Sequence, residues 1–141
     1  MRHIVIFVVC VFLAACSSNN KDIKITQKIR GAGDCVYCVG WTWNDGEATS
    51  ISRADEGCFK FEATVSGELT FYYKQFSNWS ETHLSVSIDE KIYFHLGVYD
   101  EGYYSYNTNS YRSVNIGVLE AGQIVEFRGT GFKIADIQIS K

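Results

Sequence analysis

The sequence of 141 residues contains no proline, so its turns must depend on glycine, asparagine, aspartate and serine. It has no run or stripe of basic side chains either. Its 13 Lys and Arg are outnumbered by 16 Asp and Glu, for a net charge of −3. Neutralising phosphates requires clustered Lys and Arg, so we expect no nucleic-acid partner. No apolar run approaches the ~20 residues that a membrane-spanning helix needs. Apolar residues at helical spacing are also missing over any useful length, which argues against a helical domain.

The first 15 residues have the pattern of a secretion signal. A positive start, Met1-Arg2-His3, is followed by nine apolar residues from Ile4 to Phe12 and then by Leu13-Ala14-Ala15-Cys16. A charged start, a short apolar stretch and small residues at the cleavage point are typical of a secretory signal peptide. We therefore expect residues 1–15 to be a signal peptide and residues 22–141 to form one domain.

Leu13-Ala14-Ala15-Cys16 resembles the bacterial lipobox, in which the cysteine is acylated and the chain is cut before it. The resemblance implies that Cys16 carries the lipid and that residues 16–21 are the lipidated cysteine and its polar tether. Each buried acyl CH₂ contributes about 0.8 kcal/mol, so several chains on one residue hold a protein firmly on a membrane. In such lipoproteins, Ser17 after the lipidated cysteine implies a location in the outer membrane. The domain could lie on the periplasmic face or on the outer face. An ordinary signal peptide that ends near a cysteine is the alternative.

Three cysteines follow the signal: Cys35, Cys38 and Cys58. An odd number leaves at least one thiol free or paired between molecules. Cys35-Val36-Tyr37-Cys38 has the spacing of a redox or a zinc motif, but a redox motif belongs in a βαβ setting and a zinc site needs four ligands. Because neither condition is met, we expect either Cys35 or Cys38 to form a disulfide with Cys58, which would stabilise the domain by about 3 kcal/mol. We expect no metal ion and no other cofactor.

Apolar residues alternate with polar residues along most of the chain after residue 22. A period of two with one apolar face is typical of half-buried antiparallel strands. Short strands of this kind, separated by turn residues, predict an all-β antiparallel β-sandwich or barrel. The predicted apolar sets are Ile23, Ile25 and Ile29; Phe59, Phe61, Ala63 and Val65; Leu69, Phe71 and Tyr73; Leu84, Val86 and Ile88; Ile92, Phe94 and Leu96; Val114, Ile116 and Val118; Val125 and Phe127; and Ile134, Ile137 and Ile139.

The alternation changes parity at two places, and each change predicts an irregular strand. For the apolar sets of residues 84–88 and 92–96 to share a core face, the loop between them must be Asp89-Glu90-Lys91, or a bulge must lie beside it. Between Ile134 and Ile137 the apolar set changes parity again. We therefore predict a bulge near Ala135-Asp136, or a strand that is buried on both faces.

Four segments of the chain carry recognisable motifs: residues 66–74 (SGELTFYYK), 84–89 (LSVSID), 119–123 (LEAGQ) and 134–137 (IADI). They resemble the strands and turns of jelly-roll modules in bacterial surface and secreted proteins, and the resemblance covers roughly residues 41–139. It implies a jelly-roll sandwich and a non-catalytic module of the kind attached to carbohydrate-active or adhesive proteins. A shared jelly roll does not establish a shared ligand. Glu90 stands where these modules usually have glycine, and Cys35-Val36-Tyr37-Cys38 has no counterpart in them.

Residues 99–111, YDEGYYSYNTNSY, are the leading candidate for a binding surface. Tyrosine offers rigid amphipathic area and Ser and Asn offer adaptable hydrogen bonds, as in antibody paratopes. A sugar ring also suits these residues, because its apolar faces pack on aromatic rings and its hydroxyls bond to polar groups. A tyrosine-rich edge strand without a ligand is the alternative. The predicted ligand-binding residues are Tyr99, Tyr103, Tyr104, Tyr106 and Tyr111, with Trp79 in a separate exposed loop.

Other chemistry-bearing residues give no sign of catalysis. Trp41 and Trp43 lie on one face of a predicted strand, which we expect to point into the core. His83 and His95 fall on the polar faces of adjacent strands, and two histidines make only half a metal site. No serine has Gly-x-Ser-x-Gly spacing, and paired carboxylates lie at turns, where adjacent side chains diverge. The jelly-roll resemblance sometimes implies a structural Ca²⁺, for which Asp136 is a candidate ligand, but no loop has calcium-ligand spacing.

These observations favour a non-enzymatic, lipid-anchored envelope protein that binds a glycan or a cell-envelope polymer through aromatic side chains. The alternative is an envelope structural or partner lipoprotein, such as a pilotin-like chaperone or an inhibitor. Such a protein would contact another protein through an exposed strand edge or through the tyrosine-rich segment.

Overall fold

The computed structural model describes residues 26–51, 55–77, 81–97 and 110–141. In these ranges the chain forms strands and one short 3₁₀-helix, and no helix has the length and apolar character needed to cross a membrane. The predicted all-β class is therefore confirmed. The elements are β1 (Thr26–Ile29), η1 (Ala32–Asp34), β2 (Tyr37–Val39), β3 (Trp41–Asn44), β4 (Glu47–Ser50), β5 (Gly57–Glu62), β6 (Gly67–Gln75), β7 (His83–Ile88), β8 (Lys91–Gly97), β9 (Arg112–Leu119), β10 (Ile124–Thr130) and β11 (Phe132–Ser140).

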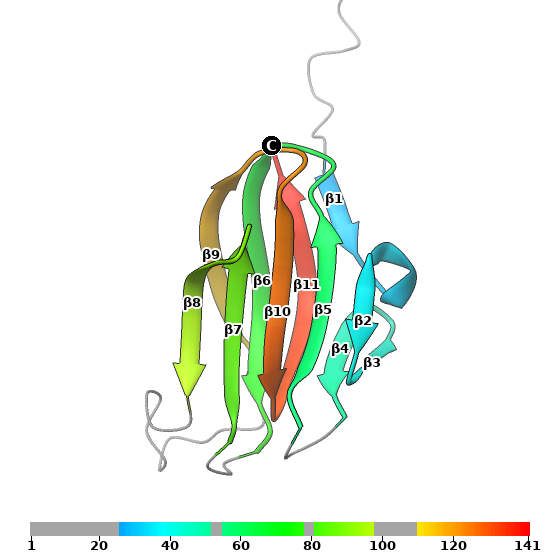
Figure 1. The fold of residues 1–141 in the computed structure, drawn as a ribbon, viewed down its shortest axis with the longest axis vertical. Coiled ribbons are helices and arrows are strands. Elements are labelled where there is room, and N and C mark those ends of the chain that lie inside the picture. The colour runs from blue at the N-terminus through cyan, green and yellow to red at the C-terminus, as the bar shows by residue number, and fades with distance from the viewer. Residues whose placement is uncertain (1–25, 52–54, 78–80, 98–109) are drawn as a thin grey trace, which may run out of the picture.

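The strands form two antiparallel sheets packed face to face (Figure 1). The six-stranded sheet has the order β3-β4-β11-β6-β9, with β1 also paired to β11, and the five-stranded sheet has the order β2-β5-β10-β7-β8. From β4 onward the chain passes repeatedly between the sheets, so neighbouring strands come from distant parts of the sequence. This double Greek-key order is that of a jelly roll, which confirms the predicted sandwich.

The core between the sheets is built on aromatic rings. The ring of Phe127 stacks on Phe59 with centroids 4.8 Å apart, and Phe71 of the opposite sheet meets Phe127 edge-on at 5.0 Å. Trp41 and Trp43 both meet Phe59 edge-on, at 5.3 and 5.1 Å. The prediction that these two tryptophans face the core is confirmed.

The hairpin of β7 and β8 contains a predicted bulge. Asp89 and Glu90 form a two-residue turn in which both φ angles are positive, 47° and 70°. Beside this turn the pairing shifts after Val86, and the shift keeps Val86 opposite Phe94 on the inner face. Ile92 lies between the bulge and the turn, where the inward and outward positions of β8 are exchanged relative to the rest of the strand. The expectation that Ile92 faces the core is therefore wrong, and its side chain is 60% exposed.

The last strand, β11, contains the other predicted bulge. Its pairing with β6 shifts between Ala135 and Gln138, and Asp136 has a positive φ of 50°. One residue is thus inserted into the strand. Because of this insertion Ile134 and Ile137 are both buried in the core, although they are an odd number of positions apart.

A third irregularity, in β9, was not indicated by the sequence pattern. The pairing of β9 with β6 shifts between Leu69 and Thr70, next to Gly117, whose φ is 106°. Beyond this point Leu119 is buried, whereas Val118 is 74% exposed. The expectation that Val118 faces the core is therefore wrong.

The three described cysteines are free thiols, so the predicted disulfide to Cys58 is wrong. Directly opposite residues of an antiparallel pair point to the same face of a sheet. Cys38 lies opposite Phe59 of the core, whereas Cys58 lies opposite the exposed Val39. Cys38 and Cys58 therefore point to opposite faces, and Cys35 packs against the core on the same side as Cys38.

Candidate ligand-binding site

The bulge in β11 creates an opening on the outer face of the six-stranded sheet. Along one edge of β11, residues 133–135 pair with β4 and residues 137–140 pair with β1. Between these two neighbours lies a pocket of about 280 Å³, bordered by the Asp45-Gly46 turn that joins β3 to β4. We call it the bulge pocket. Its aromatic and polar lining consists of Lys28, Arg30, Asp45, Tyr72, Asp136 and Gln138.

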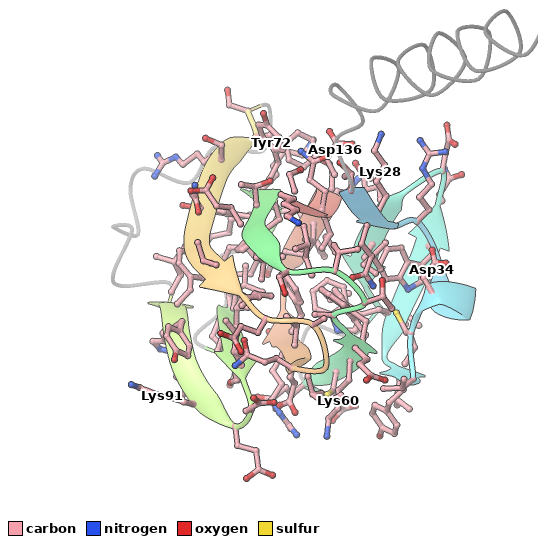
Figure 2. The ribbon with its side chains drawn as sticks, turned by 90° about the horizontal axis from the view of Figure 1, so that it is seen from above. Lys28, Asp34, Lys60, Tyr72, Lys91 and Asp136 are labelled. Carbon is pink, nitrogen blue, oxygen red and sulfur yellow. The ribbon has the colours of Figure 1, made fainter. Side chains whose placement is uncertain are left out.

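Tyr72 is the aromatic wall of the bulge pocket. It lies on β6 opposite Ala135 of β11, and its side chain is 43% exposed. Figure 2 shows Tyr72, Asp136 and Lys28 on one broad side of the sandwich and Lys60 on the opposite side. Tyr72 is not among the binding residues predicted from the sequence. The signal that could have found it is an aromatic ring at an outward-facing position of an alternating strand.

The charged side chains of the bulge pocket have no ion-pair partner in the part of the chain that the structure describes. Lys28, Arg30, Asp45 and Asp136 form no ion pair with another described residue. Lysine and arginine are hydrogen-bond donors, and an ionised carboxylate is an acceptor with up to four lone-pair sites. The pocket therefore offers both donors and acceptors to a ligand.

Tyr111, a predicted binding residue, lies on the same outer face. Its hydroxyl donates a hydrogen bond to Glu47 of β4, and the Lys74 ammonium of β6 lies 4.7 Å from the centre of its ring. Lys133 of β11 holds the same carboxylate, with 3.6 Å between its Nζ and Glu47 Oε1. These contacts fix the Tyr111 ring across the strands beside the pocket.

Electrostatics keep Tyr111 in its neutral form. Burial, the hydrogen bond to Glu47 and the charges of Glu47 and Asp136 all raise the pKa of its hydroxyl. The hydroxyl therefore remains a donor at neutral pH. Tyr111 and Tyr72 together provide aromatic surface beside a set of hydrogen-bonding groups, an arrangement that suits a ligand with both apolar faces and hydroxyls.

The outer face of the five-stranded sheet is different, because its charges pair with one another. Arg128 contacts both Glu56, at 2.9 Å, and Glu126. The second oxygen of Glu56 lies 2.7 Å from His83 Nε2, and Glu126 also pairs with Lys60 at 3.3 Å. These described charged groups are therefore engaged with one another, unlike those of the bulge pocket.

These ion pairs shift the pKa values of both carboxyls. Burial raises the pKa of Glu56, but hydrogen bonds from Arg128 and His83 outweigh burial and hold the pKa below its ordinary value of 4.5. Burial likewise raises the pKa of Glu126, and hydrogen bonds from Arg128 and Lys60 again reverse the effect. Both groups therefore remain ionised to a lower pH than an ordinary glutamate.

We expect the free energy of unfolding to fall as the pH drops below about 4.5, because the stabilisation from carboxyls with lowered pKa values is complete above that value and lost as they take up protons. Since the pairs are partly exposed, each contributes at most about 1 kcal/mol. Urea unfolding at about pH 6 and about pH 3 measures the fall, which should be smaller in the Glu56→Gln/Glu126→Gln variant. Glu120→Gln, which removes a carboxylate without an ion pair among the described residues, is the control. If the free energy of unfolding of the double variant fell as much as that of the wild type, this prediction would be contradicted.

The other predicted site residues divide into two groups. Tyr111 is described, and so are His83 and His95, which lie on adjacent strands but do not contact a common partner. Within the described ranges no group of three or more His, Cys, Asp or Glu side chains is placed to hold a metal ion. Cys16, Trp79, Tyr99, Tyr103, Tyr104 and Tyr106 lie outside the described residues.

The sequence matches no protein-family model and no curated protein sequence. The fold, in contrast, is similar to several solved structures. The K1 cleaved adhesin domain of Lys-gingipain from Porphyromonas gingivalis W83 is 12% identical, with a TM-score of 0.50 over 85% of this chain and 98% of that domain. The K2 cleaved adhesin domain of Lys-gingipain is 13% identical, with a TM-score of 0.50 over 89% and 86%.

A further similar structure is the C-terminal CBM6 of LamC from Zobellia galactanivorans. It is 16% identical, with a TM-score of 0.48 over 84% of this chain and 100% of that one. At such identities the likeness concerns the fold alone. The chain is therefore a jelly-roll β-sandwich, and its fold is similar to that of the two cleaved adhesin domains of Lys-gingipain.

Proposed function

We propose that this protein is a non-enzymatic binding module that holds a glycan or a cell-envelope polymer on the outer face of its six-stranded sheet. The observation that carries the proposal is the bulge pocket, in which Tyr72 stands beside four charged groups that have no ion-pair partner among the described residues.

Sugar rings match this chemistry. The apolar C–H face of a sugar packs on an aromatic ring, and its hydroxyls both donate and accept hydrogen bonds. Tyr72 supplies the ring, Asp45 and Asp136 accept, and Arg30 and Lys28 donate. Because Tyr111 is held in place by Glu47 and Lys74, it adds aromatic surface without a further loss of side-chain entropy on binding. The likeness to domains described as adhesins is in keeping with a binding role.

The experiment is a binding screen with glycans and peptidoglycan, using tyrosine and tryptophan fluorescence as the readout. We expect saturable binding that the Tyr72→Ala/Tyr111→Ala variant loses. Tyr93→Ala is the matched control, because Tyr93 is 52% exposed on the other sheet and should not contribute. Wild-type affinity in the double variant would place the ligand elsewhere on the molecule.

Binding of a protein partner is the second candidate function. It is favoured by the exposed apolar side chains along the edge strand β2 and the segment before it, namely Val36, Tyr37 and Val39. An edge strand also presents unpaired backbone groups to which another strand can bind. If every glycan and peptidoglycan sample failed to bind, crosslinking in cells to a discrete protein would support this alternative.

We further propose that the module is anchored in the outer membrane by lipid on Cys16, after removal of residues 1–15. The support is the lipobox-like Leu13-Ala14-Ala15-Cys16 and the polar residues that follow it. Labelled fatty acid should be incorporated into the wild-type protein and not into Cys16→Ser. Equal labelling of the two proteins would overturn the anchor and leave the binding site unaffected.

A further inference from the structure

A bulge at the start of β2 determines where two thiols point. The backbone N–H of Val36 donates a hydrogen bond to the carbonyl of Lys60 at 2.8 Å, while the next residue, Tyr37, is the residue paired with Lys60. Two residues of one strand thus face a single residue of its neighbour, which is the arrangement of a β-bulge. Val36 and Tyr37 are both exposed, although they are adjacent in the sequence.

The cysteines on either side of the bulge consequently share the inner side of the sheet. In a regular strand, residues three positions apart point to opposite faces. With the bulge between them, Cys35 and Cys38 are both partly buried and both pack against the core. Cys58 is separated from them by the sheet itself, because it faces outward opposite Val39 and Arg128.

Each thiol of the pair has a defined environment. The indole N–H of Trp43 donates to Cys38 Sγ at 3.4 Å, and the thiol of Cys35 donates to the carbonyl of Gly31 at 3.7 Å. Burial, the neighbouring Cys38 and Asp34 raise the pKa of Cys35 to about 12. Cys35 is therefore a thiol at neutral pH, and its exchange reactions should be slow.

We propose that Cys35 and Cys38 are a dithiol site that an external disulfide oxidises to an intramolecular disulfide, while Cys58 remains a thiol. One thiol of the pair attacks the external disulfide, which forms a mixed disulfide and releases the first external thiol. The second thiol of the pair then attacks the mixed disulfide, which forms the intramolecular bond and releases the second external thiol. The pair loses two electrons and two protons, and the external disulfide is reduced to two thiols. The site does not depend on the identity of the ligand in the bulge pocket.

The test maps the thiols of the folded full chain, in a Cys10→Ser/Cys16→Ser background that leaves the three described cysteines. The protein is equilibrated with oxidised glutathione and then alkylated with iodoacetamide in urea, because Cys58 is buried in the folded chain. It is then digested and analysed by mass spectrometry. We expect the peptide that contains Cys35 and Cys38 to lose two hydrogens and to resist alkylation, and Cys58 to be alkylated. Alkylation of both Cys35 and Cys38, glutathione retained on either of them, or a bond to Cys58 would each overturn the proposal.

Two variants and a spectroscopic readout separate this pair from other thiol chemistry. Because Trp43 contacts Cys38, oxidation should change the tryptophan emission. The change should persist in Cys58→Ser and disappear in Cys38→Ser, with circular dichroism to verify that both variants are folded. An emission change in Cys38→Ser would assign the redox chemistry to other groups.

Discussion

Deletion of Asp136 is expected to turn β11 into a regular strand, to abolish binding at the bulge pocket and to leave the protein folded. Asp136 belongs to the bulge in β11, and without it Ala135 and Gln138 would be two positions apart, as their partners Tyr72 and Thr70 on β6 already are. Side chains alternate between the faces of a regular strand, so Ile134, Ile137 and Ile139 would all still point into the core. Because no core side chain is exposed, we expect a loss of no more than about 3 kcal/mol, out of a total stability that is typically about 5–15 kcal/mol.

Urea unfolding followed by far-UV circular dichroism measures the stability, and fluorescence titration with the glycan measures the loss of the pocket. Asp136→Asn is the matched control, because it keeps the inserted residue and asparagine tolerates the positive φ at this position. We expect the control to unfold within about 1 kcal/mol of the wild type and to bind the glycan more tightly than the deletion variant. An unfolded deletion variant would show that β11 cannot pair without its bulge, and equal affinity of the two variants would remove the bulge from the site.

Loss of the two aromatic rings on the six-stranded sheet is expected to lower ligand affinity roughly 100-fold, since about 1.5 kcal/mol per ring is lost in the Tyr72→Ala/Tyr111→Ala variant. Tyr72 contributes exposed ring surface at the bulge pocket, and Tyr111 is held ready by Glu47 and Lys74. The same variant should keep most of its stability, because both rings lie outside the core. Fluorescence titration with the glycan identified in the screen gives the dissociation constants.

Tyr111→Phe distinguishes the ring of this residue from its hydroxyl. It keeps the aromatic surface and removes the hydrogen bond to Glu47. If stacking is the main contribution, Tyr111→Phe should bind much more tightly than Tyr111→Ala. Equal losses in the two variants would assign the contribution to the hydroxyl, and unchanged affinity in both would remove Tyr111 from the site.

The fold class could be predicted from the sequence because side chains at odd and even positions of a strand point to opposite faces. Alternation placed Phe71, Val86 and Phe127 in the core, and the breaks in alternation indicated the bulges in β8 and β11. The same rule failed for Ile92 and Val118, since the sequence does not show on which side of a bulge a residue lies. In β9 the bulge beside Gly117 leaves a pattern that still alternates, so nothing in the sequence marks it.

Composition indicated a binding role for the tyrosine-rich segment of residues 99–111, and Tyr111 is its one tyrosine within the described residues. Tyr72 looked unremarkable in the sequence because its neighbours on β11 and β1 come from other parts of the chain. The thiols show the same limit. A bond to Cys58 was expected because neither a redox nor a zinc site fitted the sequence, whereas the register of β2 with β5 puts a sheet between Cys58 and the other two.

The sequence by itself determined which residues face inward wherever a strand is regular, because local alternation is a property of each strand alone. Only the tertiary structure decided which outward residues meet, because that depends on strand order and register. The bulge pocket exists because β1 and β4 share one edge of β11 and the inserted residue separates them, which brings Lys28, Asp45, Tyr72 and Asp136 around one opening.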